Sequence, residues 1–359
     1  MGKFLEKAQK GRGAVSSPEG RFESLTREAA HDGWDISEEP LPPFQTTVTA
    51  EAARSIIARN DSPDIGFEQS INPYRGCEHG CIYCYARPAH AYMNLSPGID
   101  FETKLFYKAD AAKLLEQELR KPGYQCKTIH IGGNTDGWQP VERKLEVTRS
   151  VLQVLQRFRH PCTLITKSTL VERDLDILAE MARDHLVGAA VSVTSMHDDL
   201  KRTLEPRTAG PVARIRTIRK LAEAGVPVTV MFAPLIPFVN DADMEAVLEA
   251  AAEAGATGAG YVFLRLPHEV KLLFEDWLKV HYPMKAEHVM SLVAQARGGK
   301  AYDSQFFKRQ RGEGPYAELM QQRFLLACRR FGLNKSGRHD LDTSKFRVPA
   351  ATGDQMGLF

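Results

Sequence analysis

Residues 77–85 read CEHGCIYCY and hold three of the six cysteines of this 359-residue chain. The spacing is Cys77-x-x-x-Cys81-x-x-Cys84, so three thiols fall within eight residues of a cysteine-poor sequence. Structural zinc sites close with four ligands, and ferredoxin clusters usually have four cysteines. Three thiolates in one loop therefore predict an iron-sulfur cluster in which one iron has no protein ligand.

The same triplet leaves a second interpretation open. A zinc ion bound by the three cysteines could be completed by His79, or by a distant histidine or cysteine. The chain would then be a non-catalytic zinc-binding nucleic-acid module. The local spacing does not separate the two interpretations, and the pattern downstream favours the cluster.

Tyr83 and Tyr85 flank the last cysteine, and with them the loop resembles the signature of the radical SAM superfamily. The resemblance implies that Cys77, Cys81 and Cys84 hold one 4Fe-4S cluster and that S-adenosylmethionine (SAM) chelates its fourth iron. Reductive cleavage of SAM would then yield a 5'-deoxyadenosyl radical, which abstracts hydrogen from a substrate. The implied electron donor is a flavodoxin or a ferredoxin.

From residue 128 onward, short β-branched runs alternate with longer helical patterns, which is typical of βα units around a parallel sheet. The expected strands are residues 128–132, 163–166, 187–193, 226–232 and 258–264, and the expected helices are residues 141–158, 173–183, 211–224 and 241–254. One strand before Cys77 brings the count to six. The predicted fold is α/β, matching the partial (β/α)6 TIM-like barrel of the radical SAM core that the resemblance implies.

Active sites of such barrels lie just past the carboxyl ends of the strands. After the second expected strand, the resemblance implies an acceptor for the SAM ammonium group, and the sequence leaves it open among Asn134, Thr135 and Asp136. Lys167 follows the third strand and could neutralise the SAM carboxylate. The predicted cofactor contacts are Gly132, Gly133, Asn134, Thr135, Asp136, Lys167, Ser192 and Thr194.

Three stretches, residues 77–88, 134–142 and 204–241, look like the spore-photoproduct-lyase-like branch of the superfamily, which includes DNA repair lyases. This resemblance covers about residues 64–266 and implies hydrogen abstraction from nucleic acid, as in repair of a DNA lesion.

In the lyase, a cysteine just beyond the second strand returns hydrogen to the product, and that position here is Gly133 or Asn134. Tyr83 and Tyr85 are therefore the candidate catalytic residues for relaying a hydrogen. A radical SAM enzyme that modifies a protein or small molecule is the alternative that the missing thiol favours.

The three other cysteines are isolated and give no sign of a second cluster. Cys126 and Cys162 precede expected strands, and Cys328 lies in an apolar helical run, so each is expected to be a buried small hydrophobe.

The composition predicts one large core with extensions, since 43% of residues are hydrophobic and 26% are charged. No apolar run approaches the roughly 18 residues that span a bilayer, and the charged start lacks a signal peptide, so we expect a cytoplasmic protein with no membrane partner. The expected organisation is an irregular extension over residues 1–63, the partial barrel over 64–282, a helical region over 283–335 and a flexible tail over 336–359.

The formal net charge is +2, but residues 300–349 carry eleven Lys/Arg against five Asp/Glu. Two helices, residues 287–297 and 315–331, are expected to flank a loop at 303–314 that combines Phe306 and Phe307 with three basic residues. This mixture favours nucleic acid, with DNA as the expected partner. The alternatives are an ordinary loop with buried aromatics and, for the basic charge, a solvated helix face.

The last five residues read QMGLF and are similar to the motif by which bacterial proteins dock on the DNA sliding clamp. Gln355 would anchor by hydrogen bonds, while Met356, Leu358 and Phe359 would fill an apolar groove. The tail therefore predicts the sliding clamp as a partner. A tail that docks on its own domain is the alternative.

Overall fold

The computed structural model describes residues 3–4, 10–22, 45–335 and 341–350. Six parallel strands form its main sheet in the order in which they occur along the chain. They are β5 (Gln69–Ile71), β8 (Ile129–Ile131), β9 (Cys162–Thr166), β10 (Val187–Ser192), β11 (Val228–Leu235) and β12 (Gly258–Phe263). A short strand, β4 (Ile57–Arg59), pairs antiparallel with β5, so that β4 and β12 are the outermost strands of this sheet. The predicted partial (β/α)6 architecture is confirmed.

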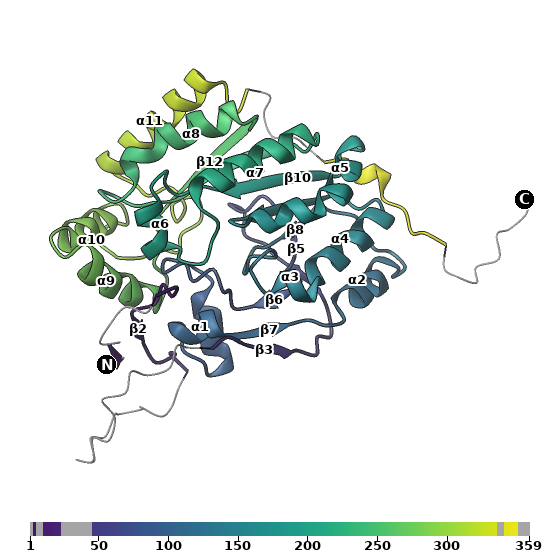
Figure 1. Ribbon diagram of the computed structural model, residues 1–359, viewed down its shortest axis with the longest axis horizontal. Helices are drawn as coiled ribbons and strands as arrows, with labels where there is room; N and C mark the ends of the chain where they lie inside the picture. The colour runs from purple at the N-terminus through teal and green to yellow at the C-terminus, as the bar shows by residue number, and fades with distance from the viewer. Residues whose placement is uncertain (1–2, 5–9, 23–44, 336–340, 351–359) are drawn as a thin grey trace, which may run out of the picture.

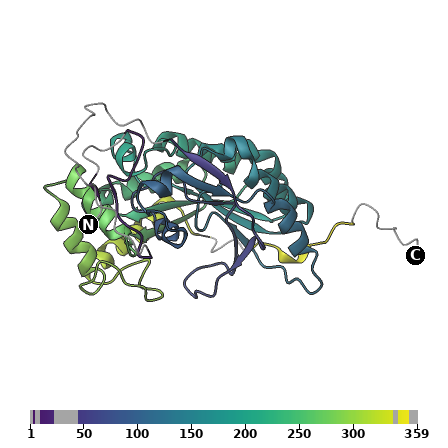
Figure 2. The same cartoon turned by 90° about the horizontal axis from the view of Figure 1, so that it is seen from below.

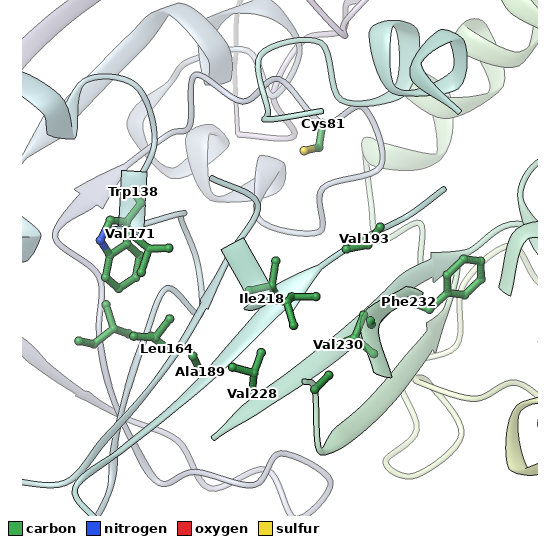
Figure 3. Packing of buried hydrophobic residues seen from close by; sticks show 14 of the residues in the cluster. Cys81, Trp138, Leu164, Val171, Ala189, Val193, Ile218, Val228, Val230 and Phe232 are labelled. Atoms are coloured by element: carbon green, nitrogen blue, oxygen red, sulfur yellow. The ribbon is translucent and has the colours of Figure 1, made fainter. Parts of the chain in front are cut away.

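Alternate residues of the strands face opposite sides of the sheet, because the side-chain period of a strand is two. Leu164, Val228 and Val230 point to the outer side and are buried in the core that Figure 3 shows. Thr163 and Thr229 point to the inner side and are only partly buried. The outer side is the hydrophobic core, and the inner side lines a cavity.

Helices that follow the strands in sequence cover the outer side (Figure 1). They are α2 (Ala111–Leu119), α4 (Val147–Arg157), α5 (Leu175–Arg183), α7 (Pro211–Glu223) and α8 (Met244–Glu253), with the 3-10 turns η2 (Thr169–Asp174) and η3 (Asp241–Asp243) leading into α5 and α8. Gly225 and Gly255 adopt φ of 80° and 95°, as expected for left-handed caps.

The expected helix over residues 141–158 is two helices, α3 (Glu142–Leu145) and α4, and this expectation was wrong. The break lies at Glu146, which has a φ of 51°. The carboxylate of Glu142 accepts hydrogen bonds from the backbone N–H groups of Thr148 (3.0 Å) and Arg149 (3.2 Å). It thereby satisfies free N–H groups in the first turn of α4, although Glu142 itself belongs to α3.

A second, three-stranded sheet was not predicted. It joins β3 (Thr47–Ala50), β7 (Lys104–Tyr107) and β6 (Tyr74–Arg75), with η1 (Arg87–Met93) and α1 (Ile99–Thr103) beside it. Of the N-terminal extension, β2 (Ser16–Ser17) pairs with β1 (Lys3–Phe4), and Ala14 and Val15 are buried, so the described part of this extension wraps the core.

Helices α6 (Asp198–Leu204), α9 (Val270–His281), α10 (Ala286–Gln295) and α11 (Pro315–Phe331) complete the described elements, with the short turn η4 (Thr343–Lys345). Figure 2 shows α9 and α10 at one end of the molecule and the yellow segment containing η4 at the other. Within the described ranges, no helix is long and apolar enough to cross a membrane. The proposed clamp-binding residues, Gln355, Met356, Leu358 and Phe359, lie outside the described residues.

Of the isolated cysteines, Cys162 and Cys328 are buried, as expected, whereas Cys126 is only half-buried.

Candidate active site

The cysteine loop follows β5 and lies at the carboxyl edge of the main sheet. Cys77 and Cys81 are buried, Cys84 is half-buried, and all three are free thiols. The loop closes with backbone hydrogen bonds from Cys84 N to Cys81 O (3.2 Å) and from Cys77 N to Phe101 O (3.0 Å). Gly80 adopts a φ of 67°, and a Cβ there would lie 2.9 Å from Glu102, so glycine is required.

A fully buried ion pair fixes this loop. The guanidinium of Arg87 donates to the carbonyls of Cys81 (2.9 Å) and Gly80 (3.2 Å) and pairs with Glu102 at 2.6 Å. Glu102 also accepts from the backbone N–H groups of Gly13 (3.0 Å) and Ala14 (2.9 Å), so the N-terminal extension braces the loop. Neither Arg87 nor Glu102 was a predicted site residue.

Burial and then nearby Glu205 raise the pKa of the Cys81 thiol to about 12, against the opposing charge of Lys167. Such a thiol is neutral until a metal displaces its proton. In the described part of the chain, no three His, Cys, Asp or Glu side chains converge on a point that could hold one metal ion. This finding does not bear against a cluster, because its thiolates bind different irons and need not converge on one point.

The segment after β8 contains most of the predicted cofactor contacts, and two of them brace the cysteine loop. Thr135 donates its hydroxyl to the carbonyl of Gly76 at 2.7 Å. The carboxylate of Asp136 accepts from Thr166 Oγ1 and Lys167 N, both at 2.8 Å, and faces His79 Nδ1 at 3.3 Å.

Burial alone would raise the pKa of Asp136, but His79 and these hydrogen bonds lower it to about 2. His79, the residue that would complete a zinc site in the alternative interpretation, is thus paired with Asp136. Asn134 remains an exposed side chain at the small cavity above the cysteines, together with Gly132 and Gly133.

Glu205 is the centre of a buried network beneath the loop. Its carboxylate accepts from the hydroxyls of Tyr83 and Thr194 and pairs with Arg214. Burial opposes ionisation, yet Arg214 and Lys167 lower the pKa of Glu205 to about 2. Thr194 is therefore hydrogen-bonded to Glu205 and lines neither cavity, and its contact with the cofactor stays a prediction.

Lys167 is the charged side chain that links two cavities. A small cavity of about 120 Å³ lies over the cysteines, and a larger one of about 760 Å³ runs along the inner side of the sheet. The residues that line both are Tyr85, Gly133, Ile165, Lys167 and Ser192. Burial lowers the pKa of Lys167, but Cys81 and Glu205 raise it above its ordinary value, so the ammonium is charged.

The two candidate catalytic tyrosines differ in their surroundings. The hydroxyl of Tyr83 is tied to Glu205, whereas that of Tyr85 donates to the carbonyl of Gly133 at the junction of the cavities. The guanidinium of Arg265 lies 5.6 Å from the ring centroid of Tyr85. Of the two, Tyr85 is the one placed beside both cavities.

The loop over residues 303–314 contacts both the last parallel strand, β12, and the segment before the first, β5. Gln310 O accepts from Phe263 N at the end of β12 (2.8 Å), and Arg309 pairs with Asp64, which precedes β5. Phe306 and Phe307 are exposed, as nucleic-acid contacts would have to be. Of the three basic residues of this loop, Arg309 is paired with Asp64, which leaves Lys308 and Arg311 as its candidate phosphate contacts.

The sequence between the cysteine loop and α8 decides the family. A model of the radical SAM superfamily matches residues 71–251, which is half of the chain. The chain belongs to the radical SAM superfamily. Members use a 4Fe-4S cluster and SAM, and the donor set described here, three thiols in one loop beside a partly buried ammonium, fits both groups.

Relatives by sequence include an uncharacterized protein of Mycobacterium tuberculosis, which is 36% identical over 219 residues. The match covers 60% of this chain and 64% of that protein. An uncharacterized protein of Methanocaldococcus jannaschii is 25% identical over 232 residues, covering 65% of this chain and 83% of that protein.

Among solved structures, a mutant of spore photoproduct lyase has the same fold, with a TM-score of 0.54 and 15% identity over 80% of each chain. Spore photoproduct lyase complexed with dinucleoside spore photoproduct matches at a TM-score of 0.54 and 14% identity, again over 80% of each chain. The expected resemblance to this lyase therefore extends to the fold.

Sequence reasoning missed Arg87, Glu102, Glu205 as a network centre, and Arg265. Two signals were available. Arg87 stands three residues after the last cysteine, and Arg265 stands two residues after the sixth strand, a strand end for which no site residue was predicted.

Proposed function

We propose that Cys77, Cys81 and Cys84 of this radical SAM protein hold one 4Fe-4S cluster, and that the enzyme abstracts a hydrogen atom from nucleic acid in a reaction of the DNA lesion repair type. When bound, the cluster and SAM supply the 5'-deoxyadenosyl radical for that abstraction. The observation that carries the proposal is a rigid three-thiol loop at the carboxyl edge of six parallel strands, opening past Lys167 and Tyr85 into an apolar cavity.

The chain's own residues have separate parts in this proposal. Lys167 neutralises the SAM carboxylate, and Asn134 accepts from the SAM ammonium group, since Thr135 and Asp136 are bound within the protein. Ser192 lines both cavities and offers a hydroxyl to SAM. Arg87 and Glu102 position the cysteines without contacting either cofactor.

Three features support nucleic acid as the substrate. The structures of similar fold include a lyase complexed with a dinucleoside lesion. The C-terminal region is basic, and Phe306 and Phe307 are exposed beside the cavity wall formed by Gln310. Base stacking on aromatic rings and phosphate contacts with basic residues are the usual means of binding single strands. A sliding clamp and a flavodoxin or ferredoxin remain predicted partners.

Hydrogen return to the product radical is assigned to Tyr85, because no thiol stands at Gly133 or Asn134. The hydrogen atom leaves the Tyr85 O–H bond for the product radical, and the resulting tyrosyl radical takes one electron from the predicted flavodoxin or ferredoxin and one proton from solvent. Replacing Tyr85 by Phe should keep SAM cleavage and slow product formation. Normal turnover by this variant would contradict the relay. The missing thiol also favours the second candidate function, a radical SAM enzyme acting on a protein or small molecule.

The test is anaerobic reconstitution with iron and sulfide, followed by dithionite reduction with SAM and measurement of 5'-deoxyadenosine. The wild type should form 5'-deoxyadenosine and Cys81→Ala should not. Damaged single-stranded DNA should increase the yield if nucleic acid is the substrate. A reconstituted wild type that leaves SAM intact would contradict the proposal.

A further inference from the structure

Two cationic side chains line the larger cavity, and the proposed binding of SAM uses only one of them. Its ionised lining residues are Asp64, Lys167 and Arg265. Asp64 is neutralised by Arg309, and Lys167 is the side chain assigned to SAM. Within the described ranges, Arg265 forms no ion pair with a carboxylate, which leaves its positive charge facing the cavity.

Most of the hydrogen-bonding capacity of Arg265 is unused. Its Nη2 lies 3.5 Å from the hydroxyl of Tyr302, at the limit of a hydrogen bond, and its face lies over the ring of Tyr85. Its buried Nε has no hydrogen-bond partner among the described residues. A guanidinium presents five donors in a planar fork that matches a phosphate or carboxylate, so this side chain has the chemistry to bind an anion.

A second buried arginine strengthens the case. Arg297 donates to the carbonyls of Lys308 (2.8 Å), Leu264 (3.0 Å) and Phe263 (3.3 Å), and it forms no ion pair within the part of the chain that the structure describes. Burial, and then the charge of Arg265, lower the pKa of Arg297 to about 10. Asp303 offsets part of this effect from nearby without forming an ion pair with Arg297, and an anion at Arg265 would relieve the remaining repulsion between the two arginines.

The wall of the same cavity suits a base. Phe67 and His130 stack at 4.3 Å between ring centroids and 12° between planes, and both line the cavity. Ile165, Met231 and Val262 line it as well. A cavity of about 760 Å³ has room for a nucleotide and not for a duplex, so a base must leave its stack to enter.

We propose that Arg265 binds a phosphodiester of the substrate strand and thereby holds an unstacked nucleotide in the apolar cavity. This proposal rests on nucleic acid being the substrate. Arg297 acts as a positioning residue, because it fixes the carbonyls at the end of β12 from which Arg265 projects.

The test uses a fluorescein-labelled single-stranded hexanucleotide and the reconstituted full chain. Arg265→Gln should weaken binding about tenfold or more, since a hydrogen-bonded charge pair is lost. The slope of log affinity against log salt should fall by about 0.7, as expected for one lost phosphate contact on a single strand. The matched control is Arg219→Gln, an exposed arginine of α7, which should bind like the wild type.

A neutral methylphosphonate linkage, moved one position at a time along the hexanucleotide, locates the contact. At one position it should weaken binding to the wild type about tenfold and have no further effect on Arg265→Gln, as a double-mutant cycle requires for a direct contact. Iron content and melting temperature check that the variant folds. Should it misfold, Arg265→Lys provides the second variant, for which binding intermediate between wild type and complete loss of the contact is expected.

Wild-type affinity and salt slope for Arg265→Gln, or an equal loss for Arg219→Gln, would overturn the proposal. Failure of the wild type to bind the hexanucleotide would overturn it as well, whereas 5'-deoxyadenosine formed by the same preparation would leave the radical SAM assignment standing. Conversely, oligonucleotide binding that depends on Arg265, in a preparation that does not cleave SAM, would contradict the proposed reaction and support the phosphate site.

Discussion

The carboxyl ends and the amino ends of the six parallel strands, here called the carboxyl edge and the amino edge, carry different kinds of buried polar side chain. At the carboxyl edge, buried charges such as Glu102, Glu205 and Arg214 surround the cysteine loop. At the amino edge, the buried polar side chains include Gln69 and His160, which carry no charge at neutral pH. Parallel strands send all their carboxyl ends to one edge, so loops there can carry chemistry while the opposite edge serves stability.

His160 shows the character of the amino edge. It is fully buried, with Nδ1 donating to the carbonyl of Pro161 (3.0 Å) and Nε2 within 2.9 Å of the Tyr124 hydroxyl. The ring of Phe346 lies 5.4 Å from both Tyr124 and His160. The segment over residues 341–350 is fastened there by Arg347 N, which donates to Phe158 O at 3.0 Å. Substitutions at the amino edge should lower the free energy of unfolding and leave the cluster in place. Substitutions that disrupt the carboxyl edge should lose the cluster.

The largest effect is expected for Arg87→Ala. It leaves Glu102 buried without its partner, so the free energy of unfolding should fall by about 3 to 5 kcal/mol and the cysteine loop should no longer hold iron. Iron per chain and denaturant unfolding measure both. The control is Arg75→Ala, whose exposed pair with Glu51 should contribute less than about 1 kcal/mol. Full iron content in Arg87→Ala would refute the bracing role.

The amino edge should respond to pH through His160. Burial lowers the pKa of His160 from 6.5 to about 4, so the stabilisation is present above pH 6.5 and is lost as the pH falls toward about 4. The full loss is about 3 kcal/mol, at roughly 1.4 kcal/mol per pH unit. Urea unfolding between pH 7 and 4 should show a slope that His160→Gln reduces. Tyr124→Phe is the control, since it keeps the buried histidine and should keep the slope. An unchanged slope in His160→Gln would argue against this assignment.

At the carboxyl edge, Lys167→Met should weaken SAM binding about tenfold to a hundredfold, because a charged hydrogen bond contributes about 1.5 to 3 kcal/mol. Calorimetry on the reconstituted protein measures the affinity. Lys220→Met on α7 removes an exposed lysine paired with Glu172 and should bind SAM normally. Equal affinities for the Lys167 variant and the wild type would remove Lys167 from the cofactor site.

The smallest effect is expected for Phe346→Ala. Its ring is only partly buried, so about 1 to 2 kcal/mol of stability should be lost, less than for a fully buried phenylalanine. Iron content should stay that of the wild type. Val348→Ala, an exposed position in the same segment, should change stability by less than about 0.5 kcal/mol. Iron loss in Phe346→Ala would contradict the claim that the amino edge serves stability alone.

Much of this division was readable in the sequence. The six strands were predicted because buried parallel strands are short β-branched runs bounded by helices and glycines, and Cys77, Cys81 and Cys84 were found by spacing alone. The break at Glu146 was not predicted, because Glu142 caps α4 from another helix. The commitment of Thr194 to Glu205 depends on residues eleven positions apart meeting in space, which no local pattern records.

The most direct test of the central claim, that three thiolates leave one iron open, is electron paramagnetic resonance of the reconstituted, dithionite-reduced protein with and without SAM. The account predicts a reduced cluster signal that changes when SAM is added, with about four irons per chain, and no such signal in Cys81→Ala. Tightly held zinc with no cluster signal, or a cluster whose spectrum ignores SAM, would contradict it.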